Sequence, residues 1–269
     1  MFAKVGKYKP CGIFTLGHFI LMAITGIGIM LALKCSTTKE KVYKIIKRLT
    51  IIMCILEVFK IIYSISQTSI YAVNEYMPLY YCSMLLYAGL LSSFGKGKFK
   101  RTGDVFLATG SIIGGLIFIL YPSTSLPAYP AFHIISIHSF LFHGIMVYLG
   151  ILVNKTHYIE LEKNDIKYFA SLVGIMCIVA LIVNNIFDSN LMFISKNFPG
   201  MPIEILYNMT NGTILFTLIM CIGQMTLPFY ISYYIVKKIN EYKSKKQENC
   251  ECLESSEMVC AEESEIYKT

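Results

Sequence analysis

Three of the chain's five histidines lie in one apolar stretch, residues 131–144, which reads AFHIISIHSFLFHG. They are His133, His138 and His143. The apolar run around them continues to Val153 and is long enough to cross a bilayer. Ionisable side chains inside a membrane span are costly, usually face the interior of the bundle and mark functional sites. The pattern therefore predicts a polar site inside a membrane domain.

Cys82 offers such a site a nucleophile. It follows Pro78 at the start of another apolar run, and proline suits the first position of a helix. We expect Cys82 in the second turn of that helix, where the helix N-terminus favours a thiolate. Burial in hydrocarbon opposes ionisation, so the thiol needs a polar partner, and a histidine is the natural one. The alternative interpretation is a small packing residue, a common role for buried cysteines.

His143 shares a helix face with two serines. Ser136, Ser139 and His143 are spaced i, i+3 and i+7, which places them in one stripe, and Ser139 is placed to orient the imidazole. His138 points to a different face. His143 is read either as a general base or as a core histidine whose hydrogen bonds are satisfied.

Composition and hydropathy define the elements that must position these residues. The chain has 269 residues, of which 55% are hydrophobic and 15% charged, and its mean hydropathy is +0.57. A soluble domain is about a quarter charged. We therefore predict an all-α, polytopic membrane helix bundle with about seven transmembrane helices. The expected spans are 11–33, 49–66, 78–94, 104–121, 131–153, 168–187 and 212–236.

Lysine and arginine predict the orientation of the bundle. Nineteen of them lie in alternate loops and the C-terminal tail, against four on the other side. By the positive-inside rule the N-terminus is outside, the C-terminus is cytoplasmic, and the protein is a multi-pass protein of the cell membrane. We expect a transmembrane domain over 1–236 and a charged, disordered cytoplasmic tail over 237–269, because the tail has little apolar content.

The polar residues inside the spans fall at similar depths. Counting about 1.5 Å per residue from the cytoplasmic ends places them between the bilayer midplane and its outer half. Glu57 and Lys60, three residues apart on one face, are read either as a structural ion pair or as a transport relay. The expected band holds His18, Glu57, Lys60, Cys82, His138, His143, Asn184 and Gln224.

Charge and cysteine spacing argue against other classes of partner. The formal net charge is +7, but the lysines flank the spans, so anionic lipid explains them better than nucleic acid does. The nine cysteines include no zinc-type pairing, and the C-x-C at 250–252 is a lone motif in a charged tail. We expect no metal, no cofactor and no nucleic acid.

Four stretches carry a family resemblance when taken in order. They are MPLYYCS (77–83), FHIISIHSFLFHG (132–144), VNNIFDSNLMFISKNFPG (183–200) and LPFY (227–230). Together they resemble the YwaF family of bacterial integral membrane proteins. The eukaryotic relatives of that family are the transmembrane protein 164 type acyltransferases, which move fatty acyl chains between phospholipids. The resemblance covers roughly 77–236.

The resemblance assigns roles to individual residues. It implies that Cys82 is the nucleophile and His143 its base. Tyr80 stands where the family has a histidine, which removes a possible orienting or oxyanion-binding group, although the phenol offers a hydrogen-bond donor in its place. The remaining polar matches, read as supporting or substrate-binding, are His133, Asn190 and a second asparagine, Asn184 or its neighbour Asn185.

Three functions fit this sequence. The first is a lipid acyltransferase or acyl hydrolase working through a Cys82 thioester, with phospholipid or lysophospholipid as substrate and no cofactor. The second is a small-molecule or lipid transporter that uses Glu57, Lys60 and the histidines as a proton-linked relay. The third is a seven-span sensor that responds to pH through its histidines. Only the first requires the thiol of Cys82.

Overall fold

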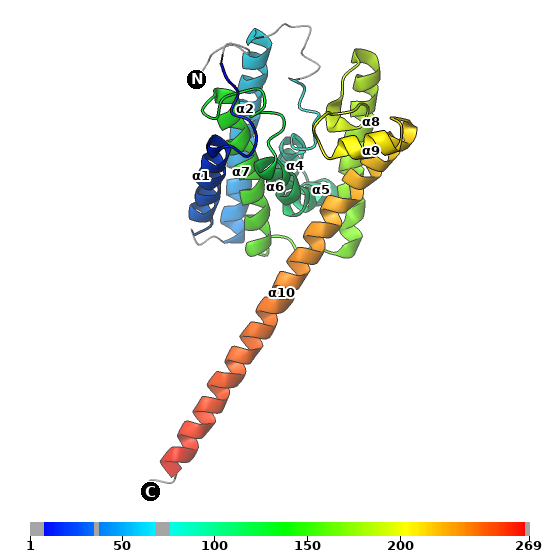
Figure 1. Cartoon of the computed structure of the whole chain (residues 1–269). Coiled ribbons are helices and arrows are strands. Elements are labelled where there is room, and N and C mark those ends of the chain that lie inside the picture. The colour runs from blue at the N-terminus through cyan, green and yellow to red at the C-terminus, as the bar shows by residue number, and fades with distance from the viewer. Residues whose placement is uncertain (1–7, 35–37, 68–75, 267–269) are drawn as a thin grey trace. The chain divides into compact units, whose positions relative to one another are not determined.

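The computed structural model of the chain describes residues 8–34, 38–67 and 76–266, with side chains described as far as Lys246. Every regular element within these ranges is helical (Figure 1). The helices are α1 (Leu16–Lys34), α2 (Lys39–Gln67), α4 (Met84–Phe94), α5 (Gly97–Ala108), α6 (Gly110–Leu120), α7 (Ile134–Lys155), η2 (Lys163–Asp165), α8 (Ile166–Phe187), η3 (Leu191–Phe193), α9 (Ile203–Met209) and α10 (Ile214–Ile266).

The predicted helical membrane bundle is confirmed. In the described part of the chain, six helices are long and apolar enough to cross a membrane: α1, α2, α5 with α6, α7, η2 with α8, and α10 up to Lys246. The third expected span is different, because α4 has only 11 residues. At about 1.5 Å per residue it covers roughly half of a hydrocarbon core. Which side of the membrane each end faces stays a prediction.

The start of α4 corrects one expectation. We expected a helix from Pro78 with Cys82 in its second turn, but α4 begins at Met84, so Cys82 precedes the helix. Tyr81 and Cys82 form turns, accepting from the backbone N–H groups of Met84 and Leu85 at 3.2 and 3.1 Å. The Tyr87 hydroxyl donates a hydrogen bond to the Pro78 carbonyl at 3.0 Å. A side-chain donor thus takes the place of the backbone N–H that would bond this carbonyl in a helix. Non-helical backbone at membrane depth requires burial in protein or a water-filled cavity.

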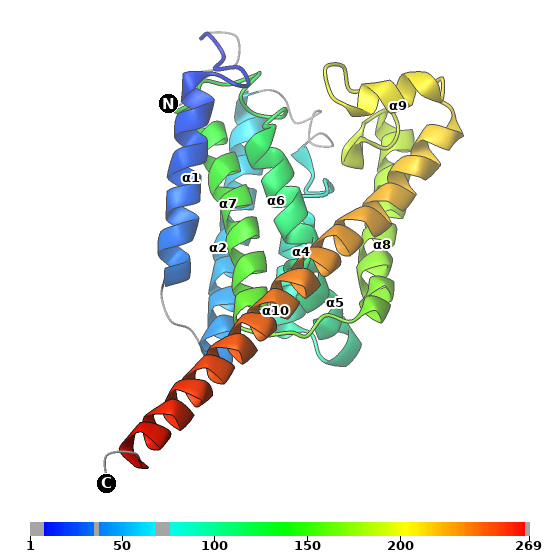
Figure 2. The same ribbon diagram turned by 60° about the horizontal axis from the view of Figure 1, so that its bottom comes forward.

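Helix α7 packs against α1, α2, α5 and α6, and Figure 2 shows α1, α2, α6 and α7 running side by side. Small residues bring these helices close together. A Cβ built on Gly144 would lie 2.8 Å from Thr25 of α1, and one on Gly115 would lie 2.6 Å from Val147 of α7. Close approach at small residues is the usual way in which membrane helices associate.

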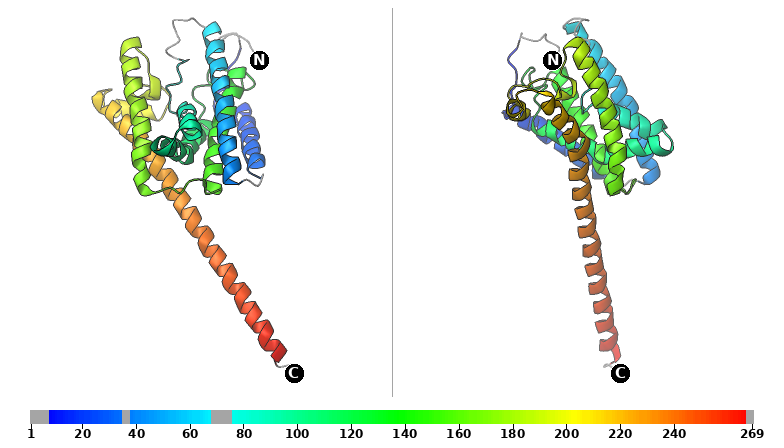
Figure 3. Two further views of the ribbon diagram at one scale, coloured as in Figure 1. Left: turned by 180° about the vertical axis from the view of Figure 1, so that it is seen from behind. Right: turned by 90° about the vertical axis from the view of Figure 1, so that its right-hand side faces the viewer.

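Helices α4 and α5 form a hairpin, which the view from behind in Figure 3 places between α2 and α8. Gly103 of α5 lies directly against the backbone of α4, where a Cβ would collide with the Ala88 carbonyl and the Ser92 nitrogen. Helix α2 also packs on α4, with Thr50 against Gly89. The hairpin therefore fixes the height of α4, and of the Cys82 turn at its start, relative to α2.

The expected fourth span is two helices. The chain breaks at Thr109 (φ −125°, ψ −76°), between α5 and α6. The Thr109 side chain bonds the Val105 carbonyl at 2.7 Å, and the Thr109 carbonyl accepts from Ser232 at 3.0 Å. Side-chain bonds to the backbone of this kind are a recognised cause of helix kinks.

The chain divides into two compact units, residues 1–232 and 233–269. The second unit covers the tail that we expected to be disordered, yet its backbone is helical as far as Ile266. Residues 237–269 contain no glycine or proline and are rich in Glu and Lys, which have good helix propensity. Low apolar content argues against a packed core and does not by itself exclude a helix. The cytoplasmic location of the tail stays a prediction.

Candidate functional site

The centre of the candidate site is a charged cluster between α2 and α7. Glu57 is 3% exposed, and its Oε1 accepts a hydrogen bond from Lys60 Nζ at 2.5 Å. Its Oε2 lies 3.9 Å from Nε2 of His138 on α7. That nitrogen is buried and has no hydrogen-bond partner among the residues that the structure describes. The structure thus joins two predicted residues of α2 to one of α7, and we call these three residues the Glu57 cluster.

The ring of His143 is fixed from two sides. Its Nδ1 lies 2.6 Å from the carbonyl oxygen of Ser139, and its face stacks on Phe118 with the ring centroids 3.6 Å apart. A carbonyl oxygen can only accept, so Nδ1 carries the proton and Nε2 presents a lone pair. Ser139 orients the imidazole as expected, but it does so through its backbone rather than its hydroxyl. His143 therefore has the tautomer that a general base needs.

Cys82 is a free cysteine with a partly exposed side chain, in the turn that leads into α4. Within the described residues, no hydrogen bond joins the Cys82 thiol to His143. Catalytic hydrogen bonds are often long in the absence of substrate and tighten when it binds. The pairing of Cys82 with His143 stays a prediction.

Tyr80 connects the Cys82 turn to a second polar region. Its ring lies 5.5 Å from that of Phe193, centroid to centroid, in the segment after α8. Met192 and Phe193 both have positive φ, 58° and 54°. Consecutive left-handed residues that are not glycine are strained and persist only where the surroundings hold them.

Two predicted asparagines do that holding. Asn184 bonds the backbone of Leu191 in both directions, with its Oδ1 accepting at 2.7 Å and its Nδ2 donating at 3.1 Å. Asn190 accepts from the backbone N–H groups of Ser195 and Lys196 at 3.1 and 3.0 Å. Both side chains are thus used within the 190–196 segment. They hold the segment whose Phe193 ring packs against Tyr80, and they do not join the Glu57 cluster. The sequence had placed Asn184 in the same polar band as that cluster.

His133 lies outside the cluster as well. It is the N-cap of α7, its Nδ1 accepts from the Ile135 N–H at 3.3 Å, and its ring stacks on Tyr129 with the centroids 4.6 Å apart. The side chain therefore fixes the start of the helix that carries His138 and His143. Both of those residues lie further along α7, so a structural role fits His133 better than substrate contact.

The sequence analysis missed an ion-pair network at the start of α5. Lys100 donates to Asp104 at 2.6 Å, and Asp104 accepts from Ser92 of α4 at 2.5 Å. The next residue after Lys100, Arg101, holds Asp165 of η2 through two bonds of 2.9 and 2.5 Å. These pairs connect the α4–α5 hairpin to α8. The only signal in the sequence is a pair of acids beside basic loops, and nothing there says which charges meet.

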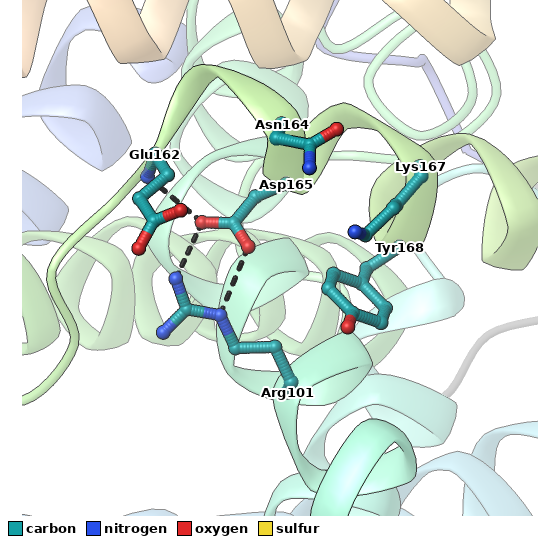
Figure 4. Close-up of a pocket in the computed structure, with 6 residues that line it drawn as sticks. All are labelled: Arg101, Glu162, Asn164, Asp165, Lys167 and Tyr168. Carbon is teal, nitrogen blue, oxygen red and sulfur yellow. Dashed lines mark hydrogen bonds and ion pairs between the residues drawn. The ribbon is translucent and has the colours of Figure 1, made fainter.

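Figure 4 shows a shallow pocket of about 200 Å³ beside this network. Its lining is polar and consists of Arg101, Glu162, Asn164, Asp165, Lys167 and Tyr168. The Arg101 guanidinium faces the Asp165 carboxylate, which also accepts from the Glu162 N–H at 2.8 Å. The Arg101 and Asp165 charges that line the pocket are thus committed to each other. No three His, Cys, Asp or Glu side chains gather as metal ligands within the described residues.

A comparison with known families gives one match. The model of the TMEM164 family matches residues 13–230, which is most of the chain and includes every helix of the candidate site. No curated protein matches, and no solved structure matches. Together with the apolar helices, the match shows a multi-pass integral membrane protein.

Proposed function

Because the chain belongs to the TMEM164 family, we propose that it is a membrane lipid acyltransferase that works through a thioester on Cys82. The donor is a phospholipid and the acceptor a lysophospholipid, or water in a hydrolytic side reaction. His143 is the base. The chemistry needs a thiol, a base and an environment that stabilises the oxyanion, all of which side chains can supply.

In the proposed first step, Nε2 of His143 takes the proton from Cys82 Sγ, and the sulfur attacks the carbonyl carbon of the lipid ester. A C–S bond forms and the ester C–O bond breaks. The leaving glycerol oxygen receives the proton from His143. In the second step the hydroxyl of a lysolipid gives its proton to His143 and attacks the thioester, which transfers the acyl chain and restores the thiol.

The observation that carries this proposal is the fixed tautomer of His143. A core histidine needs only to be satisfied, whereas His143 has Nδ1 committed to Ser139 and the ring held flat on Phe118. That arrangement leaves Nε2 as an acceptor in a defined direction. An Nδ1–H held by an acceptor is also how the catalytic histidine of a serine protease is oriented.

Tyr80 is proposed to stabilise the oxyanion of the tetrahedral intermediates. It lies two residues before Cys82, and its ring packs against Phe193 of the strained segment. A phenol donates one hydrogen bond, and loss of one oxyanion-hole donor costs about 10²–10³ in kcat.

The test is acyl transfer from a fluorescent phospholipid to a defined lysophospholipid by the purified full-length protein in nanodiscs. We expect Cys82→Ala and His143→Asn to abolish transfer. Cys221→Ala removes a partly buried free thiol on α10, and His157→Asn removes an exposed histidine, so both should keep wild-type rates. Full transfer by Cys82→Ala would refute the thioester.

A second candidate function rests on the Glu57 cluster. A buried carboxylate between an ammonium and a histidine is a common element of proton-coupled transporters. A transporter tolerates Cys82→Ala and loses its coupling in Glu57→Gln, measured as pH-driven uptake into proteoliposomes. The acyltransferase shows the reverse dependence on Cys82.

A further inference from the structure

We propose that Lys60 is the fixed cation of the Cys82 site, which stabilises negative charge on the sulfur when the thiol gives up its proton. The proposal deepens the proposed function, because it assigns a role within the same site. Four observations carry it: the helix face on which Lys60 lies, the height of α4 against α2, the bonding of the ammonium, and the charges around it.

Lys60 projects from the protein-facing side of α2. The buried residues of this helix form one stripe: Val42, Ile46, Thr50, Met53, Glu57 and Ser64. Lys60 is three residues after Glu57 and four before Ser64, so it fills the gap in that stripe. Its side chain is only 25% exposed. A lysine whose ammonium contacted only lipid headgroups would lie on the lipid-facing side of α2, away from this buried stripe.

The contact between Thr50 and Gly89 fixes the level of Cys82. Helices α2 and α4 pack together there, and they run in opposite directions, because Tyr43, before Thr50, donates to the carbonyl of Ser93, after Gly89. Glu57 is seven residues after Thr50, and Cys82 is seven residues before Gly89. Each is therefore about 10 Å from the contact, in the same direction along the bundle. The turns around Cys82 rise faster than an α-helix, which places the thiol between the levels of Glu57 and Lys60.

The ammonium of Lys60 has donors to spare. It has three N–H groups, and Glu57 Oε1 is the acceptor that the described structure gives it. That bond removes most of the freedom of the side chain and keeps the charge at one place. Glu57 thus holds the ammonium, and the two remaining donors are available to an anion.

The site is neutral before the proton transfer and gains one anion, on the sulfur, during it. Cys54 and Glu57 of α2, Tyr87 of α4, and His138 and His143 of α7 are the titratable groups that interact electrostatically around Lys60 and Cys82. With neutral histidines, Glu57 and Lys60 cancel. A proton moved from Cys82 to His143 leaves a thiolate and an imidazolium, and the Lys60 ammonium that Glu57 holds is the fixed positive charge at the level of that thiolate.

The experiment measures the reactivity of Cys82 directly, so it does not require acyl transfer. Full-length protein in nanodiscs is treated with iodoacetamide, and alkylation of the Cys82 peptide is followed by mass spectrometry from pH 6.5 to 10. An opposite charge nearby typically favours ionisation by a factor of ten or more. We expect Lys60→Met to slow alkylation about tenfold at pH 7.4, with the difference narrowing as the pH rises. Lys60→Arg keeps the charge and should stay within about threefold of wild type.

Lys44→Met is the matched control. Lys44 is a 61% exposed lysine at the other end of the same helix, paired with Glu40, and its loss should leave the Cys82 rate unchanged. Equal rates in wild type and Lys60→Met at pH 7.4 would overturn the proposal. A decrease of the same size at every pH would overturn it too, because it would report altered access rather than charge.

The outcome separates this inference from the proposed function. If the wild type transfers acyl chains and Lys60→Met alkylates normally, Lys60 has no such role and the enzyme proposal stands. If alkylation depends on Lys60 but no lipid donor is used, the cation site stands and the acyl-transfer proposal falls.

Discussion

Replacing Gly89 with alanine tests the packing that places Cys82. A Cβ on Gly89 would lie 3.0 Å from Thr50 Cγ2 and 3.2 Å from Thr50 Cβ, with Oγ1 closer still. Carbon atoms pack at about 3.5–4.0 Å, so α2 and α4 must separate by at least roughly 0.5 Å. Overpacking of this kind costs about 1–3 kcal/mol. For a domain of this size that corresponds to a fall of roughly 2–12 °C in the unfolding midpoint.

The assay is thermal unfolding of the purified protein in detergent, read by size-exclusion chromatography after heating. Gly26→Ala is the control, because Gly26 lies in the helix α1 and has no atom within 4 Å of the added Cβ. It should be neutral or slightly stabilising, since alanine has the higher helix propensity.

A second substitution tests whether contact with Thr50 causes the predicted loss of stability in Gly89→Ala. Thr50→Ala removes Oγ1 and Cγ2, so the remaining clash in the double variant Gly89→Ala/Thr50→Ala is a single contact of 3.2 Å. The double variant should therefore be more stable than the two single effects added together. The reasoning fails if Gly89→Ala behaves like Gly26→Ala, or if the two effects simply add.

Two further predictions concern the ends of the bundle. Asp165→Asn weakens both bonds to Arg101 and should cost about 2 kcal/mol, seen as a lower unfolding midpoint, whereas Glu40→Gln breaks an exposed pair and should cost almost nothing. The pKa of Glu204 is lowered by the N–H of Gly200 and by a side-chain amide. Its stabilisation of the turn before α9 is thus present above the unfolded pKa of about 4.3 and is lost as the pH falls through the lower folded value. Hydrogen exchange of this turn, corrected for intrinsic rates, should rise below pH 4 in wild type and show no such step in Glu204→Gln.

Hydropathy was sufficient to predict the apolar spans, because a bilayer leaves a spanning backbone few alternatives. It did not reveal the break at Thr109 or the helical backbone of the tail. The prediction was wrong at the third span, where the apolar run of 78–94 is only partly helical. Apolar character shows that residues avoid water. It does not show whether their backbone carbonyls accept hydrogen bonds from helical N–H groups or from side chains. The Tyr87 hydroxyl on the Pro78 carbonyl is a contact of that second kind.

The candidate site was predictable in part. Depth counting brought Glu57, Lys60 and His138 into one band of the bundle, and the structure joins them. The same counting placed Asn184 in the band, but depth does not specify direction around a helix axis, and Asn184 turns to the 190–196 segment. Pairs such as Arg101 with Asp165 stayed hidden because they join residues 64 positions apart.

The central claim is that Cys82 carries the acyl chain. The most direct measurement is to incubate the purified protein with an alkyne-tagged phospholipid, quench in acid, and score hydroxylamine-sensitive label by intact mass and by fluorescence. The account predicts one acyl chain on the wild type, located at Cys82, with none on Cys82→Ala and a strongly reduced amount on His143→Asn. Equal label on Cys82→Ala, or label that resists hydroxylamine, would contradict it.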